Sequence, residues 1–370
     1  MDDVKMKIAY FINTYKSINW GGQATSSGIK KLVEETYPNA TFTPLDLPPF
    51  PMKKVRIFRT YWERKLGKAI LDDNQMDVLK YLKKLNVDES FFQGFDTVCF
   101  NGEGAIHAKS GHLLRLLGML YIFKTKGAFV SALNQTVDLG NNDFLKKVLK
   151  KVYSMVDYLA VREPVSQREL QKLGLEPELV GDAAYALGKF SDEKIASLIP
   201  DLKLPPKFIA VTGSSYLKRN KKSIKMMDNL LSEIEKFYQG IPIYFLANAK
   251  TDIYLAHKLQ SKYGYTIFAA PEEKYERAIA VIAKAHLVIG GRQHPNIFAA
   301  MQGVPFIPLQ GNTHKMEGVV ELLNYPLTVL KWDESSEVIQ YTFKILEEYR
   351  DKLPSILTVP KPKTICLSDK

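Results

Sequence analysis

Short apolar runs alternate with amphipathic stretches along most of the chain. Several of the runs end in Gly, Asn or Ser, whereas the stretches between them repeat their apolar positions every three or four residues. The first pattern indicates buried β-strands and the second indicates α-helices. The predicted strands are residues 6–12, 41–45, 96–100, 128–133, 158–161, 208–212, 242–246, 266–268, 287–289 and 305–308.

The helical periodicity fills the spaces between these strands. It predicts helices over residues 23–35, 110–124, 142–155, 161–173, 224–237, 252–263, 275–285, 296–301 and 334–350. A basic helical stretch from Lys54 to Leu85 contains Trp62 and Tyr81, which we expect to lie in the core. Asn19 to Gly22 is expected to be a flexible turn.

Strands that alternate with helices favour parallel sheets, and the series restarts at Phe208 after a Pro-containing linker. The fold class predicted is α/β and GT-B-like, with two doubly wound, Rossmann-like parallel-sheet domains facing a cleft. We predict an N-terminal domain over residues 1–198 and a C-terminal domain over residues 207–332. Residues 333–370 are expected to form a helix and tail, the helix packing back across the domains.

Composition narrows the function classes. The balance of 51 Lys and Arg against 40 Asp and Glu gives a net charge of +11, which favours anionic partners. No nucleic-acid module accompanies this charge, so nucleic acid is not expected as a partner. The start of the chain is too polar for a secretory signal, no apolar run is long enough to span a membrane, and the two cysteines suggest no disulfide framework. We therefore expect a cytoplasmic protein.

The strongest chemical signal runs from Leu287 to Lys315. An apolar strand ends in two glycines, and Arg292, Gln293 and His294 follow before a helix in which Pro295 is an early residue. Free N–H groups at a helix start, joined by Arg and His side chains, can hold a phosphate or carboxylate. Lone Arg and His residues are usually structural, but Lys315 after the next strand strengthens the prediction of an anion site.

The first half carries weaker signals at its strand ends. Asn19-Trp20-Gly21-Gly22 follows the first strand, and Asn101-Gly102-Glu103-Gly104 follows the third. The second run is not a dinucleotide fingerprint, because the spacing of its glycines is wrong and no acidic residue follows at the usual distance. Arg162 lies beside another predicted helix start.

Taken together, these residues resemble the polysaccharide pyruvyl transferases. The resemblance rests on VREPVSQRELQKLGL around Arg162, on VGDAAYAL from Val180 to Leu187, and above all on VIGGRQHPNIFAAMQGVPFIPL followed by Lys315. Gly22 departs from an Asp that is frequent in the family, and Gln293 departs from a frequent Leu.

The resemblance implies that a pyruvyl group passes from phosphoenolpyruvate to a sugar of a polysaccharide or lipid-linked glycan, giving a pyruvate ketal and phosphate. It makes His294, Arg292 and Arg162 the catalytic candidates, with His294 as the general acid. The donor would be held by Arg162, Arg292, Gln293, His294 and Lys315. No metal and no cofactor is expected, with phosphoenolpyruvate as the donor substrate.

The resemblance makes residues 207–332 the donor phosphate side and residues 1–198 the acceptor side. The residues that bind the acceptor are harder to identify from the sequence than those that bind the donor. Asn19, Gly21, Gly102 and Glu103 are the candidate acceptor-binding residues, and Glu103 is also a candidate general base, although it could merely cap the next helix. Asp182 is expected to be structural. If the acceptor is lipid-linked, we expect peripheral contact with the inner face of the membrane that weakens with salt.

Two other functions fit parts of the same pattern. A GT-B glycosyltransferase would use the basic pocket for a nucleotide-sugar donor, with Glu317 or Glu321 on the ribose. A glycan-binding module without chemistry would keep the fold but would have no need for Arg162, Arg292, His294 and Lys315 together. The sequence specifies neither the acceptor sugar and its linkage nor the oligomeric state.

Overall fold

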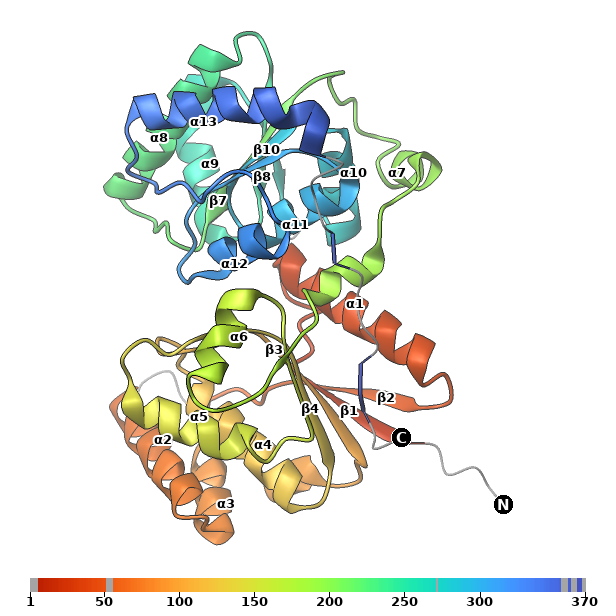
Figure 1. Ribbon diagram of the computed structural model, residues 1–370, viewed down its shortest axis with the longest axis vertical. Coiled ribbons are helices and arrows are strands. Elements are labelled where there is room, and N and C mark those ends of the chain that lie inside the picture. The colour runs from red at the N-terminus through yellow and green to blue at the C-terminus, as the bar shows by residue number, and fades with distance from the viewer. Residues whose placement is uncertain (1–5, 51–55, 271, 354–358, 361–364, 368–370) are drawn as a thin grey trace. The chain divides into compact units, whose positions relative to one another are not determined.

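The computed structural model describes residues 6–50, 56–270, 272–353, 359–360 and 365–367, with the backbone alone at 56 and 57. The chain forms two compact units. The first contains the described parts of Met1–Asn13, Lys30–Asp182 and Pro362–Lys370, and the second contains Thr14–Ile29 and the described part of Ala183–Lys361. Each unit is built on one parallel sheet (Figure 1).

The sheet of the first unit has the strand order β2-β1-β3-β4-β5-β6, and every neighbouring pair is parallel. Helices α2, α3, α4 and α5 pack against one another and cover one of its faces (Figure 1). The strands are β1 (Lys7–Phe11), β2 (Thr41–Leu45), β3 (Thr97–His107), β4 (Phe129–Asp138), β5 (Tyr158–Val161) and β6 (Glu178–Leu179). The helices of this part of the chain are α1 (Trp20–Thr36), α2 (Arg56–Leu71), α3 (Gln75–Lys84), η1 (Glu89–Phe92), α4 (Leu113–Thr125), α5 (Asp143–Tyr153) and α6 (Pro164–Gln171).

The sheet of the second unit has the order β11-β10-β7-β8-β9, again parallel throughout. Helices α10 and α11 pack together, as do α8, α9 and α13 (Figure 1). The strands are β7 (Ile209–Ser214), β8 (Ile243–Ala247), β9 (Thr266–Ala269), β10 (Leu287–Gly291) and β11 (Phe306–Pro308). The helices are η2 (Ala183–Leu187), α7 (Asp192–Leu198), α8 (Lys221–Phe237), α9 (Lys250–Tyr263), α10 (Tyr275–Lys284), α11 (Gln293–Gln302), α12 (Lys315–Leu322), α13 (Ser336–Tyr349) and η3 (Arg350–Lys352).

The strand orders locate the ligand-binding edge of each sheet. In an open parallel sheet, ligands bind beyond the carboxyl ends of the strands where the strand order reverses. That point lies between β7 and β10 in the second unit and between β1 and β3 in the first. In the second unit this point lies between two buried strands, since all residues of both β7 and β10 are buried.

The units differ from the predicted domains in three places. Residues 14–29 and 183–198 belong to the second unit, although residues 1–198 were predicted as one domain. Trp20 explains the first difference because it is fully buried in the second unit's core, with its ring centroid 5.8 Å from that of Phe268. The predicted C-terminal helix is α13, which packs on α8 within the second unit. Ile365–Leu367 join the first unit instead, where the Leu367 carbonyl accepts a hydrogen bond from Thr97 Oγ1 at 2.9 Å.

Most predicted elements are present, with shifted ends. The expected turn at Asn19–Gly22 is wrong, because α1 already begins at Trp20. Asn19 accounts for this early start, since its Oδ1 accepts a hydrogen bond from Gly21 N at 2.8 Å and so caps the helix. Strand β3 continues through Asn101–Gly104 with a register shift after Glu103, where a turn was expected. Lys54, the first residue of the predicted basic helix, lies outside the described residues. No helix in the described part of the chain is long and apolar enough to cross a membrane.

Candidate active site

The site is built where β10 ends and α11 begins. Arg292 is the N-cap of α11, whose first residues are Gln293 and His294, so the helix starts two residues before Pro295. The first backbone N–H groups of an α-helix have no partner within the helix and carry the positive end of its dipole. All ten residues of α11 are buried. The predicted trio Arg292, Gln293 and His294 therefore lies together at the amino end of a rigid, buried helix.

Arg292 is held in place by Asp252, in the first turn of α9. Its Nε and Nη2 donate hydrogen bonds of 2.9 and 2.8 Å to the two carboxylate oxygens. Asp252 is fully buried, and burial raises its pKa while the Arg292 guanidinium opposes that rise. Asn248 N also donates to Asp252 at 3.1 Å. This two-point contact fixes the plane of the guanidinium.

The contact with Asp252 uses two of the three guanidinium nitrogens of Arg292. Nη1 makes no hydrogen bond with any residue that the structure describes, and the side chain is 12% exposed. Gln293 Nε2 is buried and likewise has no acceptor among the described residues. Donors of this kind beside a helix start suit an oxyanion ligand.

His294 lies against the start of α1. A Cβ on Gly21 would lie 1.9 Å from His294 Nδ1, so any other residue at this position of α1 would displace the imidazole. The imidazole is 7% exposed, and its centroid is 6.2 Å from the Phe298 ring. Gly21, predicted to bind the acceptor, is thus a neighbour of the predicted general acid within the second unit.

Long-range hydrogen bonds hold the start of α1 in the second unit. Trp20 N donates to Asn248 Oδ1 at 2.8 Å, and Trp20 Nε1 donates to the Glu273 carbonyl at 2.7 Å. Asn248 Nδ2 lies 3.5 Å from Asn19 Oδ1. Asn248 therefore joins the Asn19–Gly21 segment to the Asp252–Arg292 pair, because it contacts both.

The other side of this sheet edge is formed by the segments after β7 and β11. Ser214 Oγ donates to the Gln310 carbonyl at 2.6 Å, and Ser215 Oγ donates to Asn312 Oδ1 at 2.8 Å. Lys315 is the first residue of α12 and packs its aliphatic stem near Gly311. The predicted donor residue Lys315 thus follows the strand next to β10 in the sheet.

Arg162 and Asp182 form a buried ion pair in the first unit. Arg162 Nη1 donates to Asp182 Oδ2 at 2.9 Å, and Nε donates to Thr136 Oγ1 at 3.0 Å. The two side chains are 2% and 3% exposed. Asp182 therefore has the structural partner that the sequence did not specify, and the donor role of Arg162 stays a prediction.

Gly102 and Glu103 lie at the carboxyl edge of the first sheet. Glu103 pairs in register with Gln135 of β4 and has φ of 36°, a left-handed conformation that is uncommon outside glycine. Ile12 and Asn134, after β1 and within β4, are left-handed as well. Asn101 is buried between them and accepts a hydrogen bond from Asn134 Nδ2 at 3.0 Å. Strained backbone of this kind gathers at functional sites, which supports the predicted acceptor edge.

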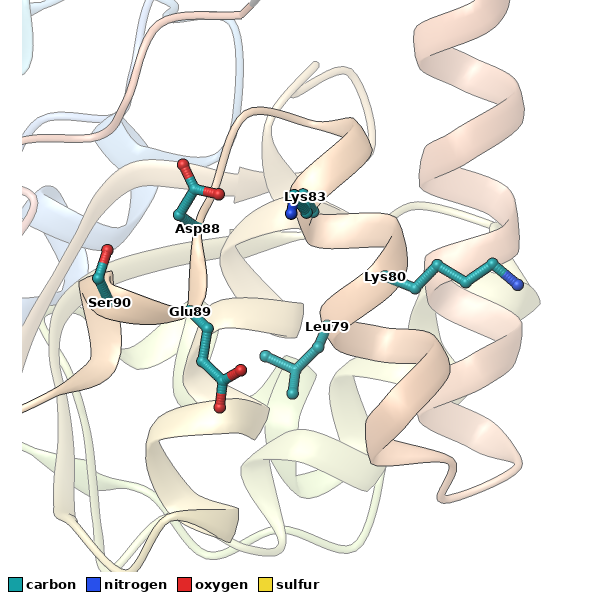
Figure 2. A pocket seen from close by; sticks show the side chains of 6 residues that line it. All are labelled: Leu79, Lys80, Lys83, Asp88, Glu89 and Ser90. Carbon is teal, nitrogen blue, oxygen red and sulfur yellow. The ribbon is translucent and has the colours of Figure 1, made fainter.

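A hollow of about 410 Å³ lies elsewhere in the first unit (Figure 2). It is lined by Leu79, Lys80, Lys83, Asp88, Glu89 and Ser90. Lys80 extends away from the two acidic side chains in Figure 2, and Glu89 is paired with Lys126 at 2.7 Å. Because η1 precedes the first residue of β3, the hollow is at the amino edge of the sheet, where ligands of such folds do not usually bind.

Sequence reasoning missed Asp252 and Asn248. Asn248 follows β8 directly and Asp252 lies in the first turn of α9, so polar residues in the turn and helix start after a buried strand were the signal that could have revealed them. Among the described residues, no three His, Cys, Asp or Glu side chains are grouped so that they could hold a metal ion.

Solved structures of other proteins share this fold. The UDP-GlcNAc 2-epimerase of Methanocaldococcus jannaschii, in complex with UDP-GlcNAc and UDP, has a TM-score of 0.61 at 15% identity, covering 97% of this chain and 96% of that chain. MnaA of S. aureus with UDP gives 0.57 at 14% identity, with 97% and 93% covered. HepE of Anabaena with UDP-glucose gives 0.55 at 14%, with 96% of each chain covered. At such identities the likeness shows the fold alone, two parallel-sheet α/β domains of the GT-B type.

The family is shown by a different comparison. The family model for polysaccharide pyruvyl transferase matches residues 19–312, which is most of the chain. The protein therefore belongs to the polysaccharide pyruvyl transferase family. No curated protein sequence matches the chain significantly.

Proposed function

We propose that the protein transfers a pyruvyl group from phosphoenolpyruvate to a sugar of a polysaccharide or lipid-linked glycan. The observation that carries the proposal is the free Nη1 of Arg292 beside the start of α11, within the part of the chain that the family matches. Phosphoenolpyruvate bears both a phosphate and a carboxylate. A fixed guanidinium with one unused donor, next to free helix N–H groups, has the charge and geometry to hold one of them.

The donor would be bound by Arg292, Gln293 and His294, with Lys315 adding a positive charge. Asp252 keeps the Arg292 guanidinium in a single orientation, so little side-chain freedom is lost when the donor binds. The charge of Arg292 would also neutralise the departing phosphate. Arg162 remains a candidate for a second contact to the donor on the strength of the family resemblance.

The chemistry proposed for His294 is general acid catalysis. Its imidazole protonates the methylene carbon of phosphoenolpyruvate, and a sugar hydroxyl adds to the central carbon. The bond from that carbon to the phosphate oxygen breaks, and a second hydroxyl of the same sugar closes the ketal. Of the two hydroxyl protons, one balances the proton now on the methyl group and the other leaves with phosphate. Histidine suits this role because it can supply a proton near neutral pH.

The residues proposed for acceptor binding form one group at the carboxyl edge of the first sheet and another at the start of α1, in the second unit. Glu103 is the proposed general base, held in a left-handed conformation on β3. Gly102 precedes it on that strand. Gly21 lies against His294, and Asn19 Oδ1 accepts a hydrogen bond from Gly21 N.

A lipid-linked acceptor would bring the protein to the membrane surface. Helix α2 offers exposed Phe58 and Tyr61 side chains, and Lys65 Nζ lies 5.7 Å from the Tyr61 ring centroid. Aromatic and basic side chains on one helix are suited to an acidic lipid surface. We propose peripheral binding that salt weakens.

A thermal-shift titration with phosphoenolpyruvate tests the proposed function. A saturable rise in Tm is expected for the wild type and not for Arg292→Ala, because a ligand stabilises only the protein that binds it. Arg277→Ala is the control, since Arg277 pairs with the exposed Asp201 in the same unit. Product analysis by mass spectrometry should then detect a ketal on an accepted sugar.

UDP-, GDP- and CMP-sugars belong in the same titration. If a nucleotide sugar alone raises Tm, the protein is a glycosyltransferase and the pyruvyl proposal fails. If a glycan alone raises Tm, the protein is a binding module.

A further inference from the structure

Four charged or titratable side chains gather at the carboxyl edge of the first sheet, outside the site described above. They are Arg59 and Glu63 in α2, and His112 and Arg115 at the start of α4. Helices α2 and α4 pack against each other (Figure 1). Each begins after the carboxyl end of a strand, β2 and β3 respectively, so Arg59, His112 and Arg115 lie near the edge where this fold binds ligands. Glu63 lies one turn further along α2.

The ring of Phe50 joins the cluster. The Arg115 guanidinium carbon lies 4.4 Å from the ring centroid, and that of Arg59 lies 4.9 Å from it. The His112 ring is stacked on Phe50, with centroids 4.9 Å apart. Two guanidinium groups on one aromatic ring repel each other, so their placement calls for negative charge nearby.

Arg115 is the unusual member of the cluster. Its side chain is fully buried, and Nη2 donates to the Pro48 carbonyl. Nε and Nη1 are buried and have no hydrogen-bond partner among the residues that the structure describes. Burial lowers its pKa only to about 10, so the group is charged at neutral pH. A buried cation with two unused donors is costly unless an anion completes it.

Glu63 does not complete the charge balance. Its nearest oxygen is 3.8 Å from Arg59 Nε, too far for a hydrogen bond, and Oε1 has no hydrogen-bond partner among the described residues. Burial raises its pKa to about 7 in spite of Arg59 and Arg115, so it carries only part of a charge at neutral pH. The cluster keeps a net positive charge.

An anion would approach from the side of Arg59 and His112. His112 is exposed, and the Arg59 side chain is 32% exposed, whereas Arg115 is fully buried. Gly111 makes room for Arg59, because a Cβ at Gly111 would lie 2.6 Å from Arg59 Nη2.

We propose that Arg59, His112 and Arg115 bind a phosphate or diphosphate group, and that this group is carried by the glycan acceptor. The anion site stands on the cluster itself, while its assignment to the acceptor rests on the proposed function. A sugar phosphate or a lipid-linked sugar diphosphate has this chemistry, with hydroxyl groups next to a strongly anionic group.

Calorimetric titration of the full chain with pyrophosphate tests the site. Two classes of binding are expected in the wild type, one removed by Arg292→Ala and the other by Arg59→Gln. The loss of a charge-assisted contact should weaken the second class about tenfold or more. Lys68→Gln is the matched control, since it neutralises an exposed cation of the same helix. Unchanged pyrophosphate binding in Arg59→Gln would overturn the proposal.

A second variant tests whether weaker binding in Arg59→Gln comes from the lost contact and not from misfolding. Gly111→Ala keeps every charge but displaces the Arg59 guanidinium, and it should weaken pyrophosphate several-fold while its circular dichroism spectrum matches the wild type. Substitution of Arg115 is less informative because the side chain is fully buried.

Sulfate binding to Arg292→Ala separates an anion site from a structural cluster. Sulfate stays a dianion across the range, so any pH dependence belongs to the protein. Affinity should fall as pH rises from 6 to 8, chiefly because Glu63 loses its proton beside Arg59 and Arg115. Burial, Arg115 and Arg59 lower the pKa of His112, so the loss of its proton contributes less over this range. Glu63→Gln should reduce this dependence and leave only the smaller part that belongs to His112. A Glu63→Gln variant with the full pH dependence of its parent would contradict the assignment.

Glucose 1-phosphate and glucose complete the experiment. Binding of the phosphate ester, lost in Arg59→Gln, with no binding of glucose supports an acceptor phosphate. If pyrophosphate binds and glucose 1-phosphate does not, the site accepts only a free anion, and its assignment to the acceptor fails. If phosphoenolpyruvate fails to bind while the cluster still binds pyrophosphate, the proposed function fails and the anion site stands.

Discussion

Asp252 decides how Arg292 can act. A bidentate, buried carboxylate leaves the guanidinium one orientation and one unused nitrogen, as a freely rotating side chain would not. Asp252→Asn should raise KM for phosphoenolpyruvate about tenfold and lower the free energy of unfolding by about 2 kcal/mol, the loss expected for hydrogen bonds to a charged group. Steady-state kinetics and urea unfolding measure the two effects.

The chain offers a matched control for this change. Asp201 makes the same two-point contact with Arg277, at 2.8 and 2.9 Å, but it is exposed. Asp201→Asn should leave both KM and stability nearly unchanged. Equal effects of the two substitutions would show that Asp252 has no special role.

His294→Ala should separate binding from chemistry. Loss of a general acid typically lowers kcat by about 10²–10⁴-fold, and donor binding should persist because Arg292 and the start of α11 remain. Calorimetry with phosphoenolpyruvate and a product assay check the two parts. A variant with nearly normal turnover would remove His294 as the acid.

Gly21→Ala tests the contact between α1 and His294. The new methyl group cannot coexist with the imidazole, so His294 must turn away. We expect kcat to fall about tenfold or more, since small misplacements of a catalytic group are costly, with only a small change in Tm. Unaltered kcat would show that the imidazole position is unimportant.

Helix α1 is the element that the sequence describes least well. Its amphipathic pattern predicted the helix, but local periodicity carries no information about Asn248 or Glu273, which are more than 200 positions away. The ends of β7 and β10 were easier to predict from the sequence, because each is marked locally by an apolar run that is followed by glycine and polar residues. Pairings such as Arg292 with Asp252, and Arg162 with Asp182, depend on strand order, so no local pattern could reveal them.

Trp20 shows what holds the start of α1. Trp20→Phe keeps most of the buried surface but leaves the Glu273 carbonyl without its donor, which should cost about 2 kcal/mol of unfolding free energy. Trp62→Phe is the control, because Trp62 is only partly buried against Tyr81 in the other unit. Denaturant unfolding of both variants measures the difference. A larger loss for Trp20→Phe than for Trp62→Phe would show that the buried Trp20 side chain holds α1 to the core of the second unit.

At the scale of the whole molecule, Glu63 and His286 should make opposite contributions to how the two units respond to acid. The Glu63 pKa is raised to about 7, so the first unit holds a proton that its unfolded chain releases, and its stability falls as pH rises from about 4.5 to 7. Burial lowers the pKa of His286 to about 4, with Arg350 contributing to the shift. The unfolded chain then holds the extra proton, so stability of the second unit rises with pH between about 4 and 6.5.

Hydrogen exchange at pH 5 and pH 7.5, corrected for intrinsic rates, should detect this divergence. On lowering the pH, protection should increase in α2 and α4 and decrease in α10 and β10. Glu63→Gln should abolish the first change and His286→Gln the second. Parallel changes in both units would contradict the assignment of these two groups.

The division of the chain between the units constrains how the protein can be made. The second unit needs residues 14–29 as well as residues after 182, and the first needs Ile365–Leu367, whose backbone bonds Thr97 and Tyr37. During synthesis the strands of the first sheet therefore leave the ribosome before Ile365–Leu367, which complete the first unit. Trp20 is also made long before most of the core that buries it, which follows Asp182 in the sequence. A cut at the boundary after Asp182 would give two incomplete fragments. Co-expressing such fragments with residues 14–29 and 365–367 exchanged to their own units is the rational route to separate domains.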